Sequence, residues 1–330
     1  MDPHLHEPPR EVAYAGRFGH GGAMSEAVPT TPPADAFGAP RALDHLVLPV
    51  SSVARARERY TALGFTVAPT GVHPFGTENC CVFFANGVFL EPLAVRRRED
   101  AEAAALAGNT FVRRDGAYRF RRDIEGYSHL VLKTDDAAAD DRAYRAAAIS
   151  GGESVEFERR FADHTGKEAR AAFALAFAGD LRAPDAGFFS CEVVDAPSVD
   201  RSALERHGNG AVAVVEVVMS EPNPTDFQYF LQDVFDQRRM DDHSFGIEFE
   251  LGNARASVLT PTGLEAFCGL AGADTTRGLL HQTFVVAVDS LSRTAELLKK
   301  NGVETLEVGK RLLVPWAPGQ GVPFLFEERT

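Results

Sequence analysis

The sequence is poor in cysteine, in basic residues and in long apolar segments, and each shortage argues against a class of protein. Four cysteines are too few for a disulfide framework in 330 residues, which favours a reducing, cytoplasmic setting. Acidic residues outnumber basic ones by 47 to 34, and the net charge of −13 disfavours non-specific binding to nucleic acid or anionic membranes. No apolar run approaches the roughly 20 residues that cross a bilayer, and the N-terminus lacks a signal-peptide pattern. We therefore expect a cytoplasmic protein that binds neither nucleic acid nor membrane.

Composition and length fit a globular protein with ample material for a core. Hydrophobic residues make up 45% and charged residues 25% of the chain, and 330 residues suffice for two domains of ordinary size. Residues 1–40 are rich in proline, glycine and alanine and show no sustained period, which is typical of a disordered extension. We expect this extension at 1–40, followed by folded domains at 41–200 and 208–330.

One motif occurs twice and organises the rest of the chain. His-Leu-Val-Leu at 45–48 returns at 129–132, and each copy opens a short apolar run typical of a strand. An alanine- and arginine-rich run with helical spacing follows each copy, at 53–63 and at 137–150. Internal repetition of this kind is a strong fold signal. It predicts two equivalent halves that present two imidazoles to one place.

A strand, a helix and three further strands recur in this order through nearly everything after residue 42. Modules of this kind begin near Leu43, Tyr127, Gly210 and Leu279. The first module is predicted to have its helix at 53–63, its strands at 43–50, 65–69, 80–85 and 88–95, and a helical connector after it at 96–107. We predict an α+β fold in which four βαβββ modules pair into two curved, mainly antiparallel sheets around clefts.

A βαβββ module with His in its first strand and Glu in its last resembles the vicinal oxygen chelate superfamily. This superfamily includes glyoxalase I, extradiol ring-cleaving dioxygenases and bleomycin-resistance proteins. The first module is similar in particular to the glyoxalase-like domain group, and the resemblance extends over roughly residues 43–327. The segments that carry it are Leu43-Asp44-His45, Leu63-Gly64-Phe65, His73-Pro74-Phe75-Gly76-Thr77-Glu78-Asn79 and Phe89-Leu90-Glu91.

The resemblance implies a metal site that the two N-terminal modules share. If these modules pair about a pseudo-twofold axis, His45 and His129 meet in one cleft, since each opens the first strand of its module. In the family the last strand lies beside the first, so Glu91 would join them. Two imidazoles and a carboxylate leave positions open for a substrate that chelates through adjacent oxygens. The set His45, Glu91 and His129 suits Fe(II), Mn, Co, Ni or Zn. Glu91 needs a cation or donors, because an unpaired carboxylate is costly to bury.

A fourth ligand from the second module stays open. Glu91 follows Gly87 by four residues, and the residue at the same distance from Gly187 is Cys191. Glu192 fits only if the register slips by one, which would turn its side chain to the other face of the strand. Either Cys191 or Glu192 is therefore a candidate.

Further residues near these strands are predicted to bind substrate or to transfer protons. The resemblance places the 73–79 motif at the mouth of the cleft, so His73 and Asn79 are expected to orient a substrate oxygen. The alternative is a structural turn, in which Asn79 bonds its own backbone. Phe89 and Phe189 complete the substrate-binding set, and Glu192 or Glu78 is the candidate catalytic base.

The leading hypothesis is a metal-dependent enzyme, either a glyoxalase-like lyase or isomerase or a non-haem dioxygenase. The alternative is a metal-free protein that sequesters an aromatic or antibiotic ligand, as in bleomycin resistance. Aromatic rings predicted to line such a cleft are Phe75, Phe83, Phe84, Phe89, Phe188 and Phe189. A third possibility is a structural homologue whose cleft is filled by side chains. The C-terminal module pair is expected to be a degenerate scaffold or a contact surface of a homodimer.

Overall fold

The computed structural model describes residues 39–162, 168–196, 200–271 and 276–329. Residues 37–330 form one compact unit. Nearly all of the extension that we predicted at 1–40 lies outside the described residues. No helix among the described residues is long and apolar enough to traverse a lipid bilayer.

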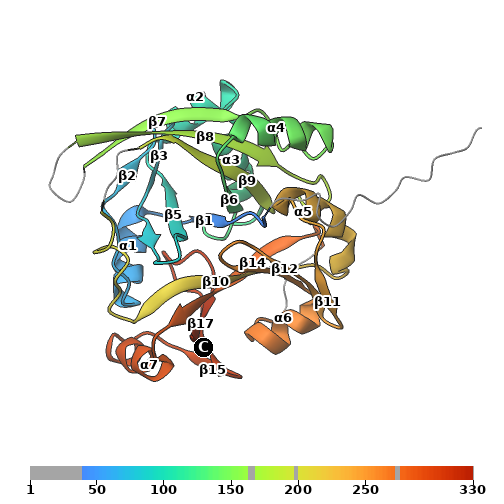
Figure 1. Cartoon of the computed structure of the whole chain (residues 1–330). Helices are drawn as coiled ribbons and strands as arrows, with labels where there is room; N and C mark the ends of the chain where they lie inside the picture. The colour runs from blue at the N-terminus through green and yellow to red at the C-terminus, as the bar shows by residue number, and fades with distance from the viewer. Residues whose placement is uncertain (1–38, 163–167, 197–199, 272–275, 330) are drawn as a thin grey trace, which may run out of the picture. The chain divides into compact units, whose positions relative to one another are not determined.

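The first two modules form one sheet of nine strands within the described chain (Figure 1). Its order is β2-β3-β5-β1-β6-β9-β8-β7, and β4 pairs with β5 outside this path. The end strands β2 and β7 contact each other, so the sheet curves almost into a barrel. The strands are β1 Leu43–Pro49, β2 Gly71–Val72, β3 Thr77–Asn79, β4 Val82–Phe83, β5 Phe89–Val95, β6 His129–Thr134, β7 Val155–Ala162, β8 Glu168–Ala178 and β9 Gly187–Asp195.

The last two modules form a second sheet of eight strands, in the order β11-β12-β13-β10-β14-β17-β16-β15. Both sheets have a central antiparallel pair, β1 with β6 and β10 with β14, flanked on each side by a parallel strand. The α+β fold with paired βαβββ modules is confirmed. The strands are β10 Ala211–Ser220, β11 Asp241–His243, β12 Gly246–Glu250, β13 Arg255–Leu259, β14 Leu280–Val288, β15 Leu306–Val308, β16 Arg311–Val314 and β17 Phe324–Glu328.

Local signals define the predicted helices well. The Ser52 side chain accepts a hydrogen bond from the Arg55 N–H at the start of α1, and Gly64 just beyond its end has φ +85°. Two helices were not predicted: α3 after the first module and α6 after the third. The helices described are α1 Val53–Ala62, α2 Arg98–Leu106, α3 Thr110–Arg121, α4 Ala137–Ala146, α5 Gln228–Phe235, α6 Pro261–Cys268 and α7 Leu291–Lys300, with a 3₁₀ turn at Pro224–Phe227.

The strand predicted at 65–69 is absent from the described sheet, and that prediction was wrong. The backbone N–H of Thr66 donates to Nδ1 of His207, and its hydroxyl donates to the Arg206 carbonyl. These bonds tie the segment to the chain at 206–207 instead of to a strand. The second strand of the module is the short β2 instead.

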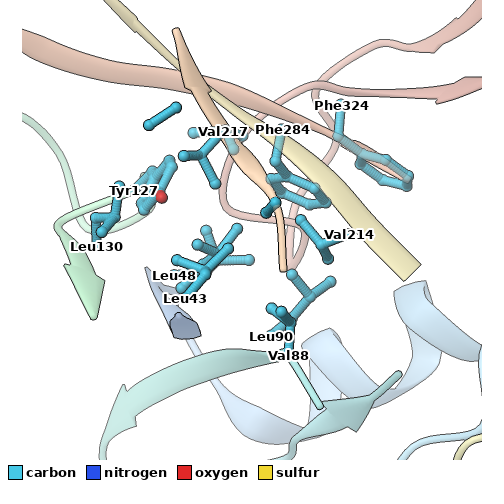
Figure 2. Packing of buried hydrophobic residues seen from close by; sticks show 14 of the residues in the cluster. Leu43, Leu48, Val88, Leu90, Tyr127, Leu130, Val214, Val217, Phe284 and Phe324 are labelled. Atoms are coloured by element: carbon cyan, nitrogen blue, oxygen red, sulfur yellow. The ribbon is translucent and has the colours of Figure 1, made fainter. Parts of the chain in front are cut away.

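The main core lies between the two sheets (Figure 2). Leu48, Leu90 and Leu130 of the first sheet pack in one cluster with Val217 and Phe284 of the second. Alternate residues of the same strands point to the opposite, concave face of the nine-stranded sheet. Val47, Phe189 and other apolar residues form a separate cluster there, into which α3 packs. The concave face is the one that carries His45.

Candidate functional site

His45 and Glu91 lie together on the concave face of the nine-stranded sheet. Strands β1 and β5 are parallel neighbours, with His45 opposite Phe89 and Val47 opposite Glu91, so these side chains share one face. Both His45 and Glu91 are buried. Nε2 of His45 is 3.5 Å from Oε2 of Glu91, and its Nδ1 is 2.6 Å from the carboxylate of Asp44. The structure thus supports the predicted proximity of these two residues.

A second imidazole, His73, approaches the other oxygen of Glu91. Its Nε2 is 3.7 Å from Oε1, and its Nδ1 is 2.8 Å from the Thr77 hydroxyl. Asn79 donates a hydrogen bond of 2.6 Å to the same Oε1. The buried carboxylate is therefore flanked by two imidazoles and one amide. Asn79 bonds Glu91 rather than its own backbone, so the motif at 73–79 is more than a structural turn.

Burial keeps His73 neutral. It lowers the pKa of His73 to about 3, and electrostatic interaction with Arg159, and to a smaller extent with His45, acts in the same direction. A neutral imidazole has one nitrogen that donates and one that accepts. Because Nδ1 is engaged with Thr77, Nε2 is the nitrogen left to face Glu91 and Asn79.

His129 occupies the predicted face but turns toward β9. It stands opposite Val47 on one side and opposite Gly187 on the other. A Cβ at Gly187 would overlap the imidazole and lie 2.6 Å from its Nε2, so only glycine leaves room for the ring. Nδ1 of His129 is 2.9 Å from the Ser128 hydroxyl, while Nε2 is buried without a hydrogen-bond partner among the described residues. Burial holds the pKa of His129 well below its usual value.

The register identifies the residue of the second module that matches Glu91. Phe189 stands opposite Val131 as Glu91 stands opposite Val47. Counting from the glycines gave Cys191, because Gly187 corresponds in register to Phe89 and not to Gly87. The Phe189 ring contacts both imidazoles, at 5.7 Å from His45 and 5.5 Å from His129 between ring centroids. An aromatic ring thus fills the position of a fourth ligand.

The two candidate bases lie outside this cluster. Glu192 points to the opposite face from Cys191, and its carboxylate accepts the Ala137 N–H at the start of α4. Glu78 is only half-buried, and its carboxylate lies 3.7 Å from the Arg96 guanidinium. Neither residue has the position that a base beside Glu91 would need.

Aromatic rings surround the imidazoles, and not all of them were predicted. Phe89 stacks on His45 with 4.4 Å between ring centroids. Phe111 of α3 contacts both His73 and His129, each at 6.2 Å. Phe111 was not predicted, because it belongs to a connector outside the repeated modules. Two rings predicted to line the cleft, Phe84 and Phe188, pack instead in the core between the sheets.

The arrangement fits a metal in part. Among the described residues, no three His, Cys, Asp or Glu side chains are arranged to hold an ion. However, the two distances from Glu91 to His45 and His73, 3.5 and 3.7 Å, exceed those of ordinary N–H···O hydrogen bonds. They are close to about 3.4 Å, which is the distance between two ligand atoms that each lie about 2.1 Å from a tetrahedral metal ion. His45, His73 and Glu91 are therefore the described residues closest to a ligand set.

Comparison with known proteins identifies one family. The sequence matches the family described as a glyoxalase-like domain over residues 43–235. A search of the curated proteins finds no match.

Solved structures share the fold over nearly the whole chain. A hypothetical protein from Staphylococcus aureus aligns with a TM-score of 0.59 at 13% identity, covering 88% of this chain and 100% of the other. A mutant of 4-hydroxymandelate synthase from Streptomyces coelicolor aligns with a TM-score of 0.55 at 13% identity, covering 89% and 94%. At such low identity these similarities show the fold alone.

Proposed function

The chain belongs to the glyoxalase-like domain family, and on that premise we propose that it is a metal-dependent enzyme. Its substrate would be a small molecule that binds a divalent metal through two adjacent oxygens. The observation that carries the proposal is the buried Glu91 carboxylate between Nε2 of His45 and Nε2 of His73. We also propose a cytoplasmic location, which agrees with four free, buried cysteines.

The hydrogen bond between His45 and Asp44 supports a ligand role for His45. Imidazoles that bind metals usually donate their other ring N–H to a carboxylate or carbonyl, which fixes the tautomer. If Nδ1–H of His45 donates to Asp44, a lone pair on Nε2 faces the Glu91 carboxylate. Two electron-rich groups at this distance in a buried site repel each other, and a cation between them removes the conflict.

We assign His45, Glu91 and His73 as the metal ligands. His73 replaces His129 of the sequence-based prediction, since Nε2 of His73 lies near Glu91 whereas no oxygen of Glu91 is within 4 Å of a His129 ring nitrogen. Asn79 would orient Glu91, while Phe89 and Phe189 would exclude water. A bound divalent metal supplies Lewis acidity toward substrate oxygens or a site for O₂.

Metal content tests this assignment. We would measure it by plasma mass spectrometry on untagged protein grown in metal-supplemented medium, for wild type and for His45→Ala, His73→Ala, His129→Ala and Glu91→Gln. We expect near one equivalent in wild type and loss in the variants of His45, His73 and Glu91. His243→Ala is the control, because this exposed histidine lies on the other sheet. Loss with His129→Ala and retention with His73→Ala would restore the ligand set predicted from sequence. No metal after reconstitution of wild type would refute metal dependence.

A metal-free binding protein is the second candidate, and the rings of Phe89, Phe111 and Phe189 around the imidazoles favour it. Such a protein needs shape and stacking rather than ligands. It predicts that an aromatic compound binds equally well before and after His45→Ala. The enzyme predicts that metal, and with it turnover, is lost in that variant. Dicarbonyl and oxygen-uptake screens on both proteins would complete the comparison.

A further inference from the structure

Arg159 stands where the nine-stranded sheet nearly closes. It belongs to β7, which contacts β2 at the opposite end of the sheet. Val155, Phe157 and Arg159 alternate along β7 and share one face. Val155 and Phe157 belong to the apolar cluster of the concave face, so the side chain of Arg159 starts on that face as well.

Three groups pack around the Arg159 guanidinium. Its Cζ lies 5.3 Å from the centre of the Phe173 ring, which gives a cation–π contact. A Cβ built on Gly71 would be 2.7 Å from Nη1 of Arg159 and 2.5 Å from Oδ1 of Asn79. Because residue 71 is glycine, the guanidinium and the Asn79 amide both approach its backbone closely, at a position that a larger side chain would occupy. The same amide donates to Glu91, so Arg159 lies near the proposed metal ligands.

Among the described residues, the Arg159 guanidinium has no anionic partner. Its Nε is buried without a hydrogen-bond partner, and no ion pair joins it to any described residue. Arg170, on the neighbouring strand of the same hairpin, is in contrast exposed and lies 2.9 Å from the Glu158 carboxylate. A partly buried cation without a counter-ion is unfavourable, so an anion would be bound strongly at Arg159.

The charge of Arg159 also affects the pKa of buried residues around Glu91. After burial, it is the main cause that lowers the pKa of His73. At the Cys81 and Cys191 thiols it acts against burial and against the Glu91 carboxylate, which both raise the thiol pKa. Arg159 thus contributes a positive charge from β7 to an interior that also holds the Glu91 carboxylate.

We propose that Arg159 binds a carboxylate of the substrate, and that the substrate class is a small aromatic acid. This rests on the proposed function, because it assigns the substrate of the same site. Arginine presents a planar fork that matches a carboxylate in a bidentate pair. Phe157 and Phe173 are half-buried, and their stacked rings lie 5.2 Å apart beside the guanidinium, where an aromatic body can pack. Asn79 lies near the guanidinium and donates to Glu91, so it connects the two parts of the proposed site.

Binding of phenylacetate and of its neutral amide, phenylacetamide, tests the proposal. The two compounds have nearly the same shape and differ in charge, and neither needs a metal. We would titrate both into wild type, Arg159→Gln and Arg159→Lys by calorimetry, with saturation-transfer NMR for weak binding. We expect wild type to bind phenylacetate at least tenfold more tightly than phenylacetamide. A tenfold difference in affinity corresponds to about 1.4 kcal/mol, close to the contribution of one charge-assisted hydrogen bond. Arg159→Gln should abolish the preference and Arg159→Lys should keep part of it.

Arg170→Gln is the matched control, since it removes an exposed arginine from the same hairpin and should change neither affinity. Equal affinities in wild type, or an unchanged preference in Arg159→Gln, would overturn the role of Arg159. Binding of neither compound to wild type would overturn the aromatic acid as substrate class. Since no metal takes part in this binding, these outcomes are independent of metal content. If wild type binds no metal but still prefers phenylacetate through Arg159, the protein is a metal-free binder of aromatic acids.

Discussion

The concave faces of the two sheets have the same strand pairing but carry different polar residues. Val47 stands opposite Glu91 and His129 in the nine-stranded sheet. Val218 stands in the same way opposite Ser257 and Thr283 in the eight-stranded sheet. The residue two before each valine is His45 in one sheet and Glu216 in the other. The second sheet therefore has Glu, Ser and Thr at the three positions where the first has His, Glu and His.

On the concave face of the eight-stranded sheet, the buried carboxylate is paired with side chains of the same sheet. The buried Glu216 accepts hydrogen bonds from the Ser257 hydroxyl at 2.7 Å, from Arg311 at 2.6 Å and from Arg255 at 3.2 Å. Burial would raise the pKa of Glu216, but the two arginines outweigh it and hold the pKa below its usual value. The nine-stranded sheet instead keeps Glu91 with a single N–H donor and His129 with a buried Nε2 that has no hydrogen-bond partner in the described chain. Glu216 is thus paired with two arginines, whereas none of the described lysines or arginines forms an ion pair with Glu91, and this difference separates the two faces.

The largest expected effect is the loss of Glu216. Glu216→Ala leaves Arg255 and Arg311 beside an empty, buried position, and removal of one partner of such a network costs about 3–5 kcal/mol. Urea unfolding followed by circular dichroism measures the change in unfolding free energy. Glu265→Ala, an exposed residue of α6, is the control and should change it by less than about 0.5 kcal/mol. A loss below about 1 kcal/mol for Glu216→Ala would mean that the network is not structural.

A smaller loss is expected from Gly187→Ala. The new methyl group would occupy the space of the His129 ring, and such overpacking costs about 1–3 kcal/mol. The same unfolding experiment measures it. Gly116→Ala in α3 provides the contrast: its Cβ would meet nothing within 4 Å, and a mid-helix glycine is about 0.5–1 kcal/mol less stable than alanine. If both variants behave alike, His129 does not depend on Gly187 for its position.

Acid should destabilise the protein through its buried histidines. Burial lowers the pKa of His281 to about 4, although its hydrogen-bond contact with the Gly187 carbonyl acts in the other direction. The unfolded chain binds this proton near pH 6.5, so the unfolding free energy falls as pH drops from about 6.5 to about 4. His281→Gln should reduce this slope by about one proton, roughly 1.4 kcal/mol per pH unit at most. The exposed His243→Gln is the control, and equal slopes in both variants would contradict this origin.

The smallest effect on stability is expected from Glu91→Gln. The amide keeps the shape of the carboxylate and removes a charge that nothing in the described chain fully neutralises. The unfolding free energy of the metal-free protein should therefore change by less than about 1 kcal/mol, in contrast to Glu216→Ala. Unfolding of chelator-treated wild type and variant measures this difference. A loss as large as that of Glu216→Ala would show that Glu91 is structural, as Glu216 is.

The fold could be predicted from the sequence because its signals are local and repeated. His45 and His129 mark equivalent strands, and alternation within each strand assigns their faces without knowledge of the partner strand. The proximity of His45 and Glu91 was predicted from the family resemblance, which implies that the last strand of a module lies beside its first. α3 and α6 escaped prediction for one reason. Each lies after an odd-numbered module and covers a concave face, outside the repeated unit.

The sequence alone therefore determined the module, its repetition and the equivalent positions of His45 and His129, because periodicity and motif spacing encode these properties along the chain. Tertiary structure decided which groups meet. Register, not distance from a glycine, set Phe189 in the position that matches Glu91. Curvature of the sheet brought Arg159 next to Asn79 from its two ends. Such contacts join residues far apart in sequence, and they depend on strand order and on side-chain direction, which a linear pattern does not specify.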